Sequence, residues 1–262
     1  MPALVLRLRE RSRALRLGLV AGACLAAVAI LALRGPIFEV TNEGTLADRR
    51  TFFGLPNAWN VLSNLPFAAV GALGLARVRP LAPALRPAVF LCFLAIAAVA
   101  LCSGFHHLAP SPERLLVDRL PITLAFVGLF AWVLGDRLHP RWALALPLPG
   151  ALLAFLALWL WSHGGTGTGD LRPYALVQVL PLVAIPLLLT LFPGELRETR
   201  FLAALALYGL ALACQALDAR IFALGEIVSG HTVKHLLAAA ACACLVPPAP
   251  ATRSRPSAPA RR

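Results

Sequence analysis

The sequence predicts an all-α, polytopic transmembrane helix bundle, on three observations: the composition, the length of the apolar segments and the distribution of the arginines. Of the 262 residues, 59% are apolar and 14% are charged, and the mean hydropathy is +0.77. An average soluble domain is about 45–50% apolar and about 25% charged. This composition excludes a disordered chain, a disulfide-stapled secreted domain and an ordinary soluble enzyme.

Eight segments are apolar over most of the roughly 17–25 residues that a helix needs to cross a bilayer. Strands are not expected, because the alternation of a barrel is absent and an open strand cannot satisfy its backbone in lipid. The shortest segments are marginal in length, which leaves seven or nine spans as alternatives. We expect helices at Leu17–Leu33, Ala58–Ala76, Pro87–His107, Arg119–Leu134, Trp142–Trp161, Pro173–Phe192, Phe201–Leu217 and His231–Val246.

Two of these segments carry additional signals. Leu17–Leu33 follows five arginines, as the apolar part of a signal peptide does, but no small-residue cleavage site ends it before Arg34. We therefore interpret it as an uncleaved N-terminal anchor. Trp142, Trp159 and Trp161 bracket the fifth segment and are typical of membrane-interface anchors.

The chain divides into three predicted parts. Residues 1–57 hold a basic cytoplasmic N-terminus, the extra transmembrane anchor and an outer loop. Residues 58–246 hold a seven-helix core. Residues 247–262, rich in Pro, Ala, Ser and Arg, are expected to form a disordered cytoplasmic tail.

The arginines predict the orientation. With the N-terminus inside and eight alternating spans, sixteen of the 24 basic residues and four of the 12 acidic residues fall on the inside. The net charge of +12 then lies entirely on that side, so the positive-inside rule predicts cytoplasmic termini. The alanine- and arginine-rich composition suits a bacterial inner membrane. Arginines at the ends of apolar segments, without interleaved aromatics, favour membrane topology over nucleic-acid binding, and no protein partner is predicted.

Polar side chains gather at the predicted outer ends of three spans. They are Ser103, His106 and His107 at the end of the third span, Asp118 at the start of the fourth, and His231, Lys234 and His235 at the start of the last. The topology that places them at one depth rests on the arginines alone. Ionisable groups inside a membrane are costly and usually functional.

The histidine spacing points to a metal. His231 and His235 are four residues apart and share one helix face. With a third histidine they supply the three protein ligands of a catalytic zinc site, which leaves the fourth position to water. Zinc lowers the pKa of such a water to about 7, and Asp118 can hold or deprotonate it. The alternative for Asp118 is an ion pair with Arg119 or Arg172.

The other polar residues have simpler interpretations. Lys234 is expected to point away from the histidine face and to extend toward lipid headgroups. His139 is expected at the inner interface and His163 in a solvated loop. Asp218, Arg220 and Glu226 could order the last outer loop by ion pairing.

The second span opens with the polar sequence PNAWNVLSN, which contains Asn60, Ser63 and Asn64. These side chains either cap the helix and hydrogen-bond neighbouring helices, or support the metal site from behind. The sequence alone leaves both options open.

Together, W-N-x-x-S-N, S-x-x-x-H, an aspartate eleven residues later and H-x-x-x-H resemble the alkaline ceramidase family. That family belongs to a seven-helix hydrolase superfamily that also includes the adiponectin and progestin receptors. The resemblance covers residues 58–246. It implies a zinc cofactor held by His107, His231 and His235, with Ser103 and Asp118 beside the metal. His107 is chosen over His106 because only His107 keeps both spacings.

The resemblance implies hydrolysis of the amide bond of a ceramide-like lipid to a fatty acid and a sphingoid base. The family's calcium site is not expected, because Glu43, Asp48 and Asn57 offer too few oxygen ligands. The alternative is a receptor-like member with structural zinc and little turnover, which the short inner loops disfavour. A transporter is disfavoured because the polar cluster lies at one leaflet and not at the midplane.

Overall fold

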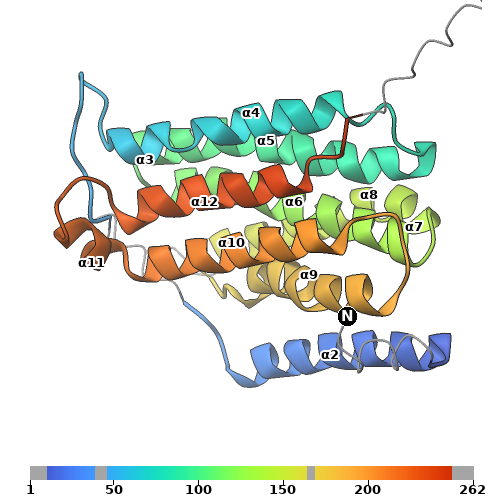
Figure 1. Ribbon diagram of the computed structural model, residues 1–262. Helices are drawn as coiled ribbons and strands as arrows, with labels where there is room; N and C mark the ends of the chain where they lie inside the picture. The colour runs from blue at the N-terminus through green and yellow to red at the C-terminus, as the bar shows by residue number, and fades with distance from the viewer. Residues whose placement is uncertain (1–10, 39–45, 164–168, 250–262) are drawn as a thin grey trace, which may run out of the picture.

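The computed structural model describes residues 11–38, 46–163 and 169–249, and these residues form an all-α bundle without strands (Figure 1). The predicted fold class is confirmed. The elements are α2 (Arg13–Leu33), α3 (Ala58–Leu62), α4 (Leu65–Ala76), the 3-10 helix η1 (Pro83–Leu85), α5 (Arg86–Leu108), α6 (Pro112–Arg137), α7 (Arg141–Ala145), α8 (Pro147–Ser162), α9 (Arg172–Leu191), α10 (Glu198–Ala216), α11 (Asp218–Ala223) and α12 (Gly230–Leu245).

All eight predicted segments are helical, and two of them are broken. The second segment divides into α3 and α4 around Ser63 and Asn64, just before Pro66. The fifth divides into α7 and α8 where Pro147 begins a new helix. Proline removes a backbone donor and crowds the preceding turn, which explains both breaks. The first break places two polar side chains inside the bundle.

Six helical segments in the described part of the chain are long and apolar enough to cross a membrane. A seventh, α8, is apolar but has 16 residues, and α12 also has 16. The number and length of these helices are therefore compatible with a multi-pass integral membrane protein. The six are Arg13–Leu33, Ala58–Ala76, Pro83–Leu108, Pro112–Arg137, Arg172–Leu191 and Glu198–Ala216.

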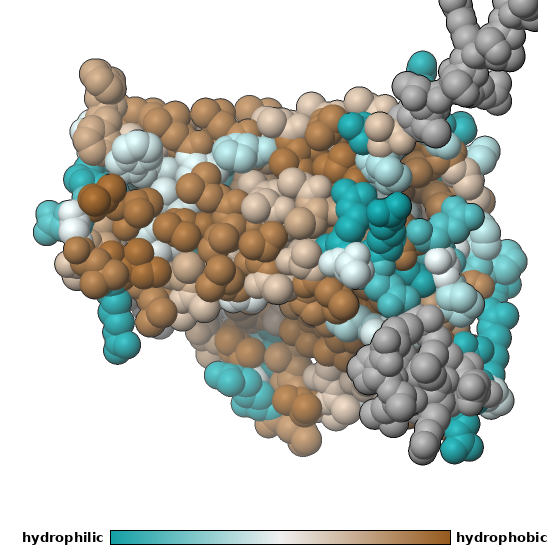
Figure 2. All heavy atoms as spheres, in the orientation of Figure 1, coloured by the Kyte–Doolittle hydropathy of each residue, from teal (hydrophilic) through white to brown (hydrophobic). Residues whose placement is uncertain are grey.

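Contacts between helix ends agree with the predicted alternation of spans. At one end of the bundle, arginine side chains donate to carbonyls of distant segments: Arg16 to Leu191, Arg77 to Pro247 and Arg137 to Phe192. Figure 2 shows apolar side chains along the middle of the molecule and hydrophilic ones gathered mainly toward the right-hand end. This is the end that the sequence assigns to the cytoplasm.

The core is built around α5 and α6, whereas α2 lies outside it. A Cβ on Gly128 of α6 would lie 2.5 Å from the backbone nitrogen of Cys92 on α5, so a glycine permits this close crossing. Phe93 and Trp132 pack edge to face between the same helices, with ring centroids 6.3 Å apart. None of the residues of α2 is buried, and that helix packs against α9 (Figure 1).

The fourth helix begins earlier than predicted. Ser111 caps α6 by accepting a hydrogen bond from the backbone of Arg114, and Pro112 occupies the first turn. These are strong helix-start signals. They place Asp118 in the second turn of α6, whereas the sequence predicted it at the outer start of the span, immediately before Arg119.

Candidate metal centre

Three histidine rings meet inside the bundle. His107 lies in the last turn of α5, and His231 and His235 lie in the first turns of α12. All three are buried. The Nε2 atoms of His107 and His231 are 3.2 Å apart, and the three ring centroids are 4.6 to 5.0 Å from one another. One ligand atom from each ring lies within 4.8 Å of the other two, so the group could hold a metal ion.

The spacing of His107 and His231 suits a tetrahedral ion. Zinc–nitrogen distances of about 2.0–2.1 Å place two ligand nitrogens roughly 3.3–3.4 Å apart, close to the observed 3.2 Å. Without an ion, two neutral imidazoles facing each other can share one N–H···N bond. The Nδ1 atoms of His107 and His231 have no hydrogen-bond partner among the described residues. Three imidazole nitrogens directed at one buried point cannot all be satisfied by one another, so the three rings fit a metal better than an apolar core.

The start of α12 is fixed by its neighbours. Ser229 caps the helix and accepts from the backbone of Thr232 at 3.2 Å. The backbone N–H of His231 donates to Asp218 Oδ1 at 2.7 Å. A Cβ on Gly230 would lie 2.8 Å from the Cα of Asp218, so glycine allows the two segments to touch. The position of His231 therefore depends on α11, which the sequence analysis treated as a loop.

Ser63 and Asn64 contact His235 directly. Ser63 Oγ lies 2.8 Å from His235 Nδ1 and donates to the carbonyl of Asn60 at 3.2 Å. A hydroxyl that donates to the Asn60 carbonyl can accept from Nδ1–H of His235, and this tautomer leaves the lone pair on Nε2. Asn64 Nδ2 is 3.3 Å from the same Nδ1, and it also donates to the carbonyl of Asn60 at 2.7 Å. Neither Asn57 nor Asn64 makes a side-chain cap. Of the two interpretations that the sequence left open, helix capping is therefore not observed here, and Ser63 and Asn64 instead contact a histidine of α12.

Asn60 hydrogen-bonds both to α12 and to the loop before α3. Its Oδ1 accepts from the hydroxyl of Thr232 at 2.9 Å, and its Nδ2 donates to the carbonyl of Asp48 at 2.8 Å. The third histidine is held from the same side, because Asn57 Nδ2 donates to the carbonyl of His107 at 2.8 Å. His106 packs edge to face against His107 but is not in the three-ring group.

Replacing Ser63 by alanine should weaken zinc binding about 10- to 100-fold, because hydrogen bonds that orient a histidine ligand typically contribute that much. Competition with a chelator of known affinity measures the change. Ser162→Ala is the matched control, since Ser162 Oγ donates to the carbonyl of Trp159 on its own helix. Equal zinc affinities for the Ser63→Ala and Ser162→Ala proteins would contradict this role.

Ser103 and Asp118 face the same cavity as His235. Ser103 is buried one turn before His107. Asp118 lies outside the three-histidine group, and its Oδ1 is buried without a hydrogen-bond partner among the described residues. The cavity has a volume of about 350 Å³. Its remaining walls are mainly apolar and come from α4, α5, α6, α9, α10 and α12.

The ion-pair alternative for Asp118 is not favoured by the geometry. Arg172 is paired with Asp170, 2.7 Å from Nε to Oδ2. The guanidinium of Arg119 lies over the ring of Trp161, 4.4 Å from its centroid. Asp118 instead lines the cavity.

The expectation for Lys234 is wrong. Its side chain lines the cavity, and its Nζ lies 3.3 Å from His231 Nε2. Three residues along a helix is close enough for a long side chain to fold back onto the ring. By contrast, His139 and His163 are exposed, as expected.

The loop before α3 is held by an ion pair. Asp48 is buried, and its Oδ2 lies 2.7 Å from Nη2 of Arg50. Burial opposes ionisation of Asp48, but the hydrogen bonds and charge of Arg50 outweigh it and lower the pKa of the carboxyl. Asn57 faces His107, and Glu43 lies outside the described residues. The carboxylate considered for calcium is thus engaged by an arginine.

This pair gives a pH-dependent contribution to stability. Because the pKa of Asp48 is lower in the folded state, the stabilisation is complete above the unfolded value of about 3.9 and is lost as pH falls through the folded value. We expect the melting temperature of the wild-type protein in detergent to fall more steeply between about pH 5 and pH 3 than that of Asp48→Asn. Parallel curves would contradict the assignment.

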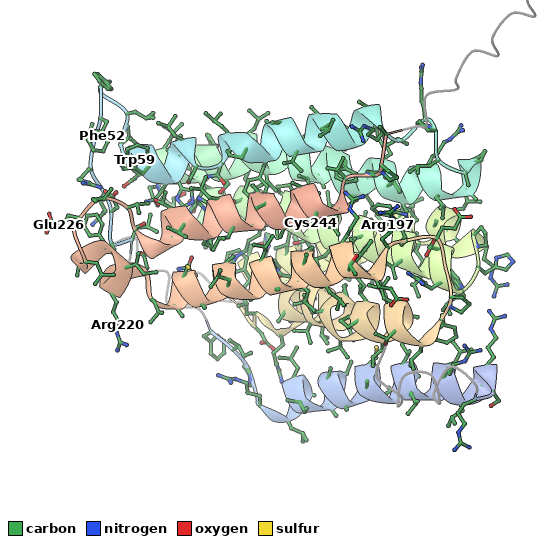
Figure 3. All side chains as sticks on the ribbon, in the orientation of Figure 1. Phe52, Trp59, Arg197, Arg220, Glu226 and Cys244 are labelled. Carbon is green, nitrogen blue, oxygen red and sulfur yellow. The ribbon has the colours of Figure 1, made fainter. Side chains whose placement is uncertain are left out.

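The last outer loop is ordered by a different set of contacts from the ion pairs predicted. Asp218 is buried and accepts backbone N–H groups from both His231 and Ala47. Glu226 contributes its backbone carbonyl, which accepts from Arg50. Figure 3 shows Phe52, Trp59, Arg220 and Glu226 at this end of the bundle, with Arg197 and Cys244 farther along it. The role of Asp218 had no signal in the sequence beyond its place before the last span.

Comparisons with protein-family models, curated proteins and solved structures find no match to this chain. Fold and site therefore define its class. It is a helical bundle compatible with a multi-pass membrane protein, with a buried cluster of three histidines that could hold a metal ion.

Proposed function

We propose that this chain is a membrane-embedded, zinc-dependent amidohydrolase that cleaves the amide bond of a ceramide-like N-acyl lipid. The resemblance of its motifs to the alkaline ceramidase family suggests this activity. The donor set supports the metal, because three neutral imidazoles without a carboxylate suit zinc.

The observation that carries the proposal is the shape of the cavity. Its polar end holds His235, Ser103 and Asp118, and its opposite end is lined by Leu189, Phe201 and Leu245, among others. Leu245 follows His235 by ten residues of one helix, or about 15 Å at 1.5 Å per residue. A slot with a reactive polar head and an apolar tail of this length suits a lipid with an extended acyl chain.

In the proposed reaction, Asp118, Ser103 and the apolar walls of the cavity each have a separate role. When bound, zinc would polarise the amide carbonyl and make a water molecule more acidic. Asp118 accepts the proton of the attacking water and passes it to the nitrogen of the leaving amine. The hydroxyl of Ser103 donates to the carbonyl oxygen as negative charge develops there. The apolar walls align the acyl chain so that its first carbon meets the histidines.

The distribution of arginines supports a bacterial inner membrane with both termini in the cytoplasm. The histidines would then lie near the outer leaflet. A substrate that reaches them from the surrounding lipid, with its chain pointing toward the inner leaflet, needs no soluble carrier.

The proposal is tested with purified full-length protein in detergent. A ceramide with a labelled acyl chain is added, and mass spectrometry follows the free fatty acid and the sphingoid base. We expect equal amounts of both products, loss of turnover with a chelator, and recovery on adding zinc. For substitutions of the three histidines, His163→Ala is the matched control, because that exposed histidine stacks on Trp159 away from the group.

One result would overturn the proposal. A zinc-loaded protein that releases no fatty acid from any N-acyl lipid would favour the receptor-like alternative with structural zinc.

A further inference from the structure

The proposed chemistry does not use Lys234, the single lysine of the sequence. It lies on α12 between two histidines of the group and lines the cavity beside Asp118. Its Nζ is 3.3 Å from Nε2 of His231. That same Nε2 lies 3.2 Å from Nε2 of His107, so it is the atom that would face the metal.

The ammonium group of Lys234 needs another acceptor. It carries three donors, and His231 Nε2 is the acceptor within hydrogen-bond distance among the residues that the structure describes. A metal ion on His231 would take that lone pair. The ammonium would then face the cavity with no acceptor from the described protein, and a charge left unpaired in a mainly apolar cavity is costly.

The charges around the site point in the same direction. Asp118 and Asp218 lie close enough to attract Lys234, and Arg119 lies close enough to repel it. A divalent ion held by three imidazoles without a carboxylate ligand adds two positive charges that its own ligands do not compensate. Asp218 is also occupied by two backbone N–H groups. A site of this charge in a medium of low dielectric favours an anionic ligand.

We propose that Lys234 binds an acidic group of the substrate next to the scissile amide. This inference rests on the proposed function and adds a preference within its substrate class for N-acyl lipids with an acidic head, such as N-acyl amino acids. In these molecules the carboxylate is one carbon from the amide nitrogen. The carbonyl can therefore lie at the histidines while the carboxylate lies at Lys234, given the 3.3 Å between Nζ and the ring.

The reaction is a simple hydrolysis. Water adds its hydroxyl to the acyl carbon, the C–N bond breaks, and the nitrogen takes the proton. The products are a fatty acid and a free amino acid, and no oxidant or further reactant is needed. Binding through an ammonium–carboxylate pair also explains why the cavity holds a lysine at a depth where charges are rare.

The test compares two lipids whose heads have similar size and different charge. N-oleoylglycine is anionic and N-oleoylethanolamine is neutral. For the zinc-loaded wild-type protein we expect kcat/KM to favour the glycine conjugate about tenfold to hundredfold, as a charge-assisted hydrogen bond allows. The preference should lie mainly in KM. Lys234→Met should reduce it to about one, and Lys234→Arg should keep most of it.

A binding measurement separates this inference from the proposed function. Each lipid is used to displace a fluorescent fatty acid from the cavity, and zinc content is measured for each variant. Stronger displacement by N-oleoylglycine that depends on Lys234, without turnover of either lipid, would support the inference and refute the hydrolase. Equal displacement and equal turnover of both lipids by the wild type would overturn the inference alone.

A Lys234→Met protein that loses both substrates equally would also overturn it, and would assign Lys234 to positioning Asp118. If Lys234→Met does not fold, Lys234→Gln takes its place.

Discussion

Replacing His231 by alanine should remove most of the zinc and lower hydrolysis about 10³-fold or more. A bound metal contributes several kcal/mol of transition-state stabilisation, and about 4 kcal/mol corresponds to a factor of 10³. The fold should survive, because the contact that fixes the start of α12 is made by the backbone N–H of residue 231 to Asp218, and alanine keeps it. Zinc content by mass spectrometry and turnover of labelled ceramide check the two effects on one sample.

Two further histidine variants check this result: one should reproduce the loss, and the other is the control that should show none. His235→Ala should behave like His231→Ala, and His163→Ala should match the wild type, since that ring is exposed and stacked on Trp159. A His231→Ala protein that keeps a full zinc complement would show that the ion is held elsewhere.

Asp118→Asn should lower turnover about 10²- to 10⁴-fold, the usual contribution of a general acid–base group. The zinc content should change little, because Asp118 is not in the three-histidine group. Asparagine has nearly the same shape, so the cavity should still accept the lipid and KM should stay close to the wild-type value. Steady-state kinetics together with metal analysis separate these quantities.

Glu113→Gln is the matched control on the same helix. Glu113 is exposed and accepts a hydrogen bond from Ser111 at the helix start, away from the cavity. Loss of zinc in Asp118→Asn would make the carboxylate a metal ligand and not a proton acceptor, and unchanged turnover would remove it from the mechanism.

Much of the fold follows from local features of the sequence. Long apolar segments bounded by arginine and proline predict helices almost regardless of context, because in lipid the backbone must satisfy itself. The broken helices had a local signal as well, since Pro66 and Pro147 lie inside apolar segments. The prolines do not predict where the broken turn points. In the structure, the turn before Pro66 places Ser63 and Asn64 against α12.

The candidate site was predictable where spacing decides it. His231 and His235 must share a helix face at four residues apart, and the arginine count placed His107 at the same depth. Lys234 was misplaced because a long flexible side chain three residues from His231 can point outward or fold back onto that ring. Packing of α12 against its neighbours decides between the two, and a sequence pattern does not contain that information.

Asp218 illustrates the same limit. Its carboxylate bridges the start of α12 and the backbone of Ala47, which precedes Asp218 by 171 residues in the chain. Such a contact exists only after the bundle has formed. Asp48 is similar, since its carbonyl supports Asn60 through a loop whose course the apolar pattern does not predict.

X-ray absorption at the zinc edge on the purified full-length protein tests the central claim most directly. We predict about one zinc per chain, with three imidazole nitrogens at about 2.0–2.1 Å and one oxygen ligand, and loss of most of the zinc in His107→Ala. A protein that binds no zinc, or one whose zinc is surrounded by sulfur or carboxylate oxygen alone, would contradict the account.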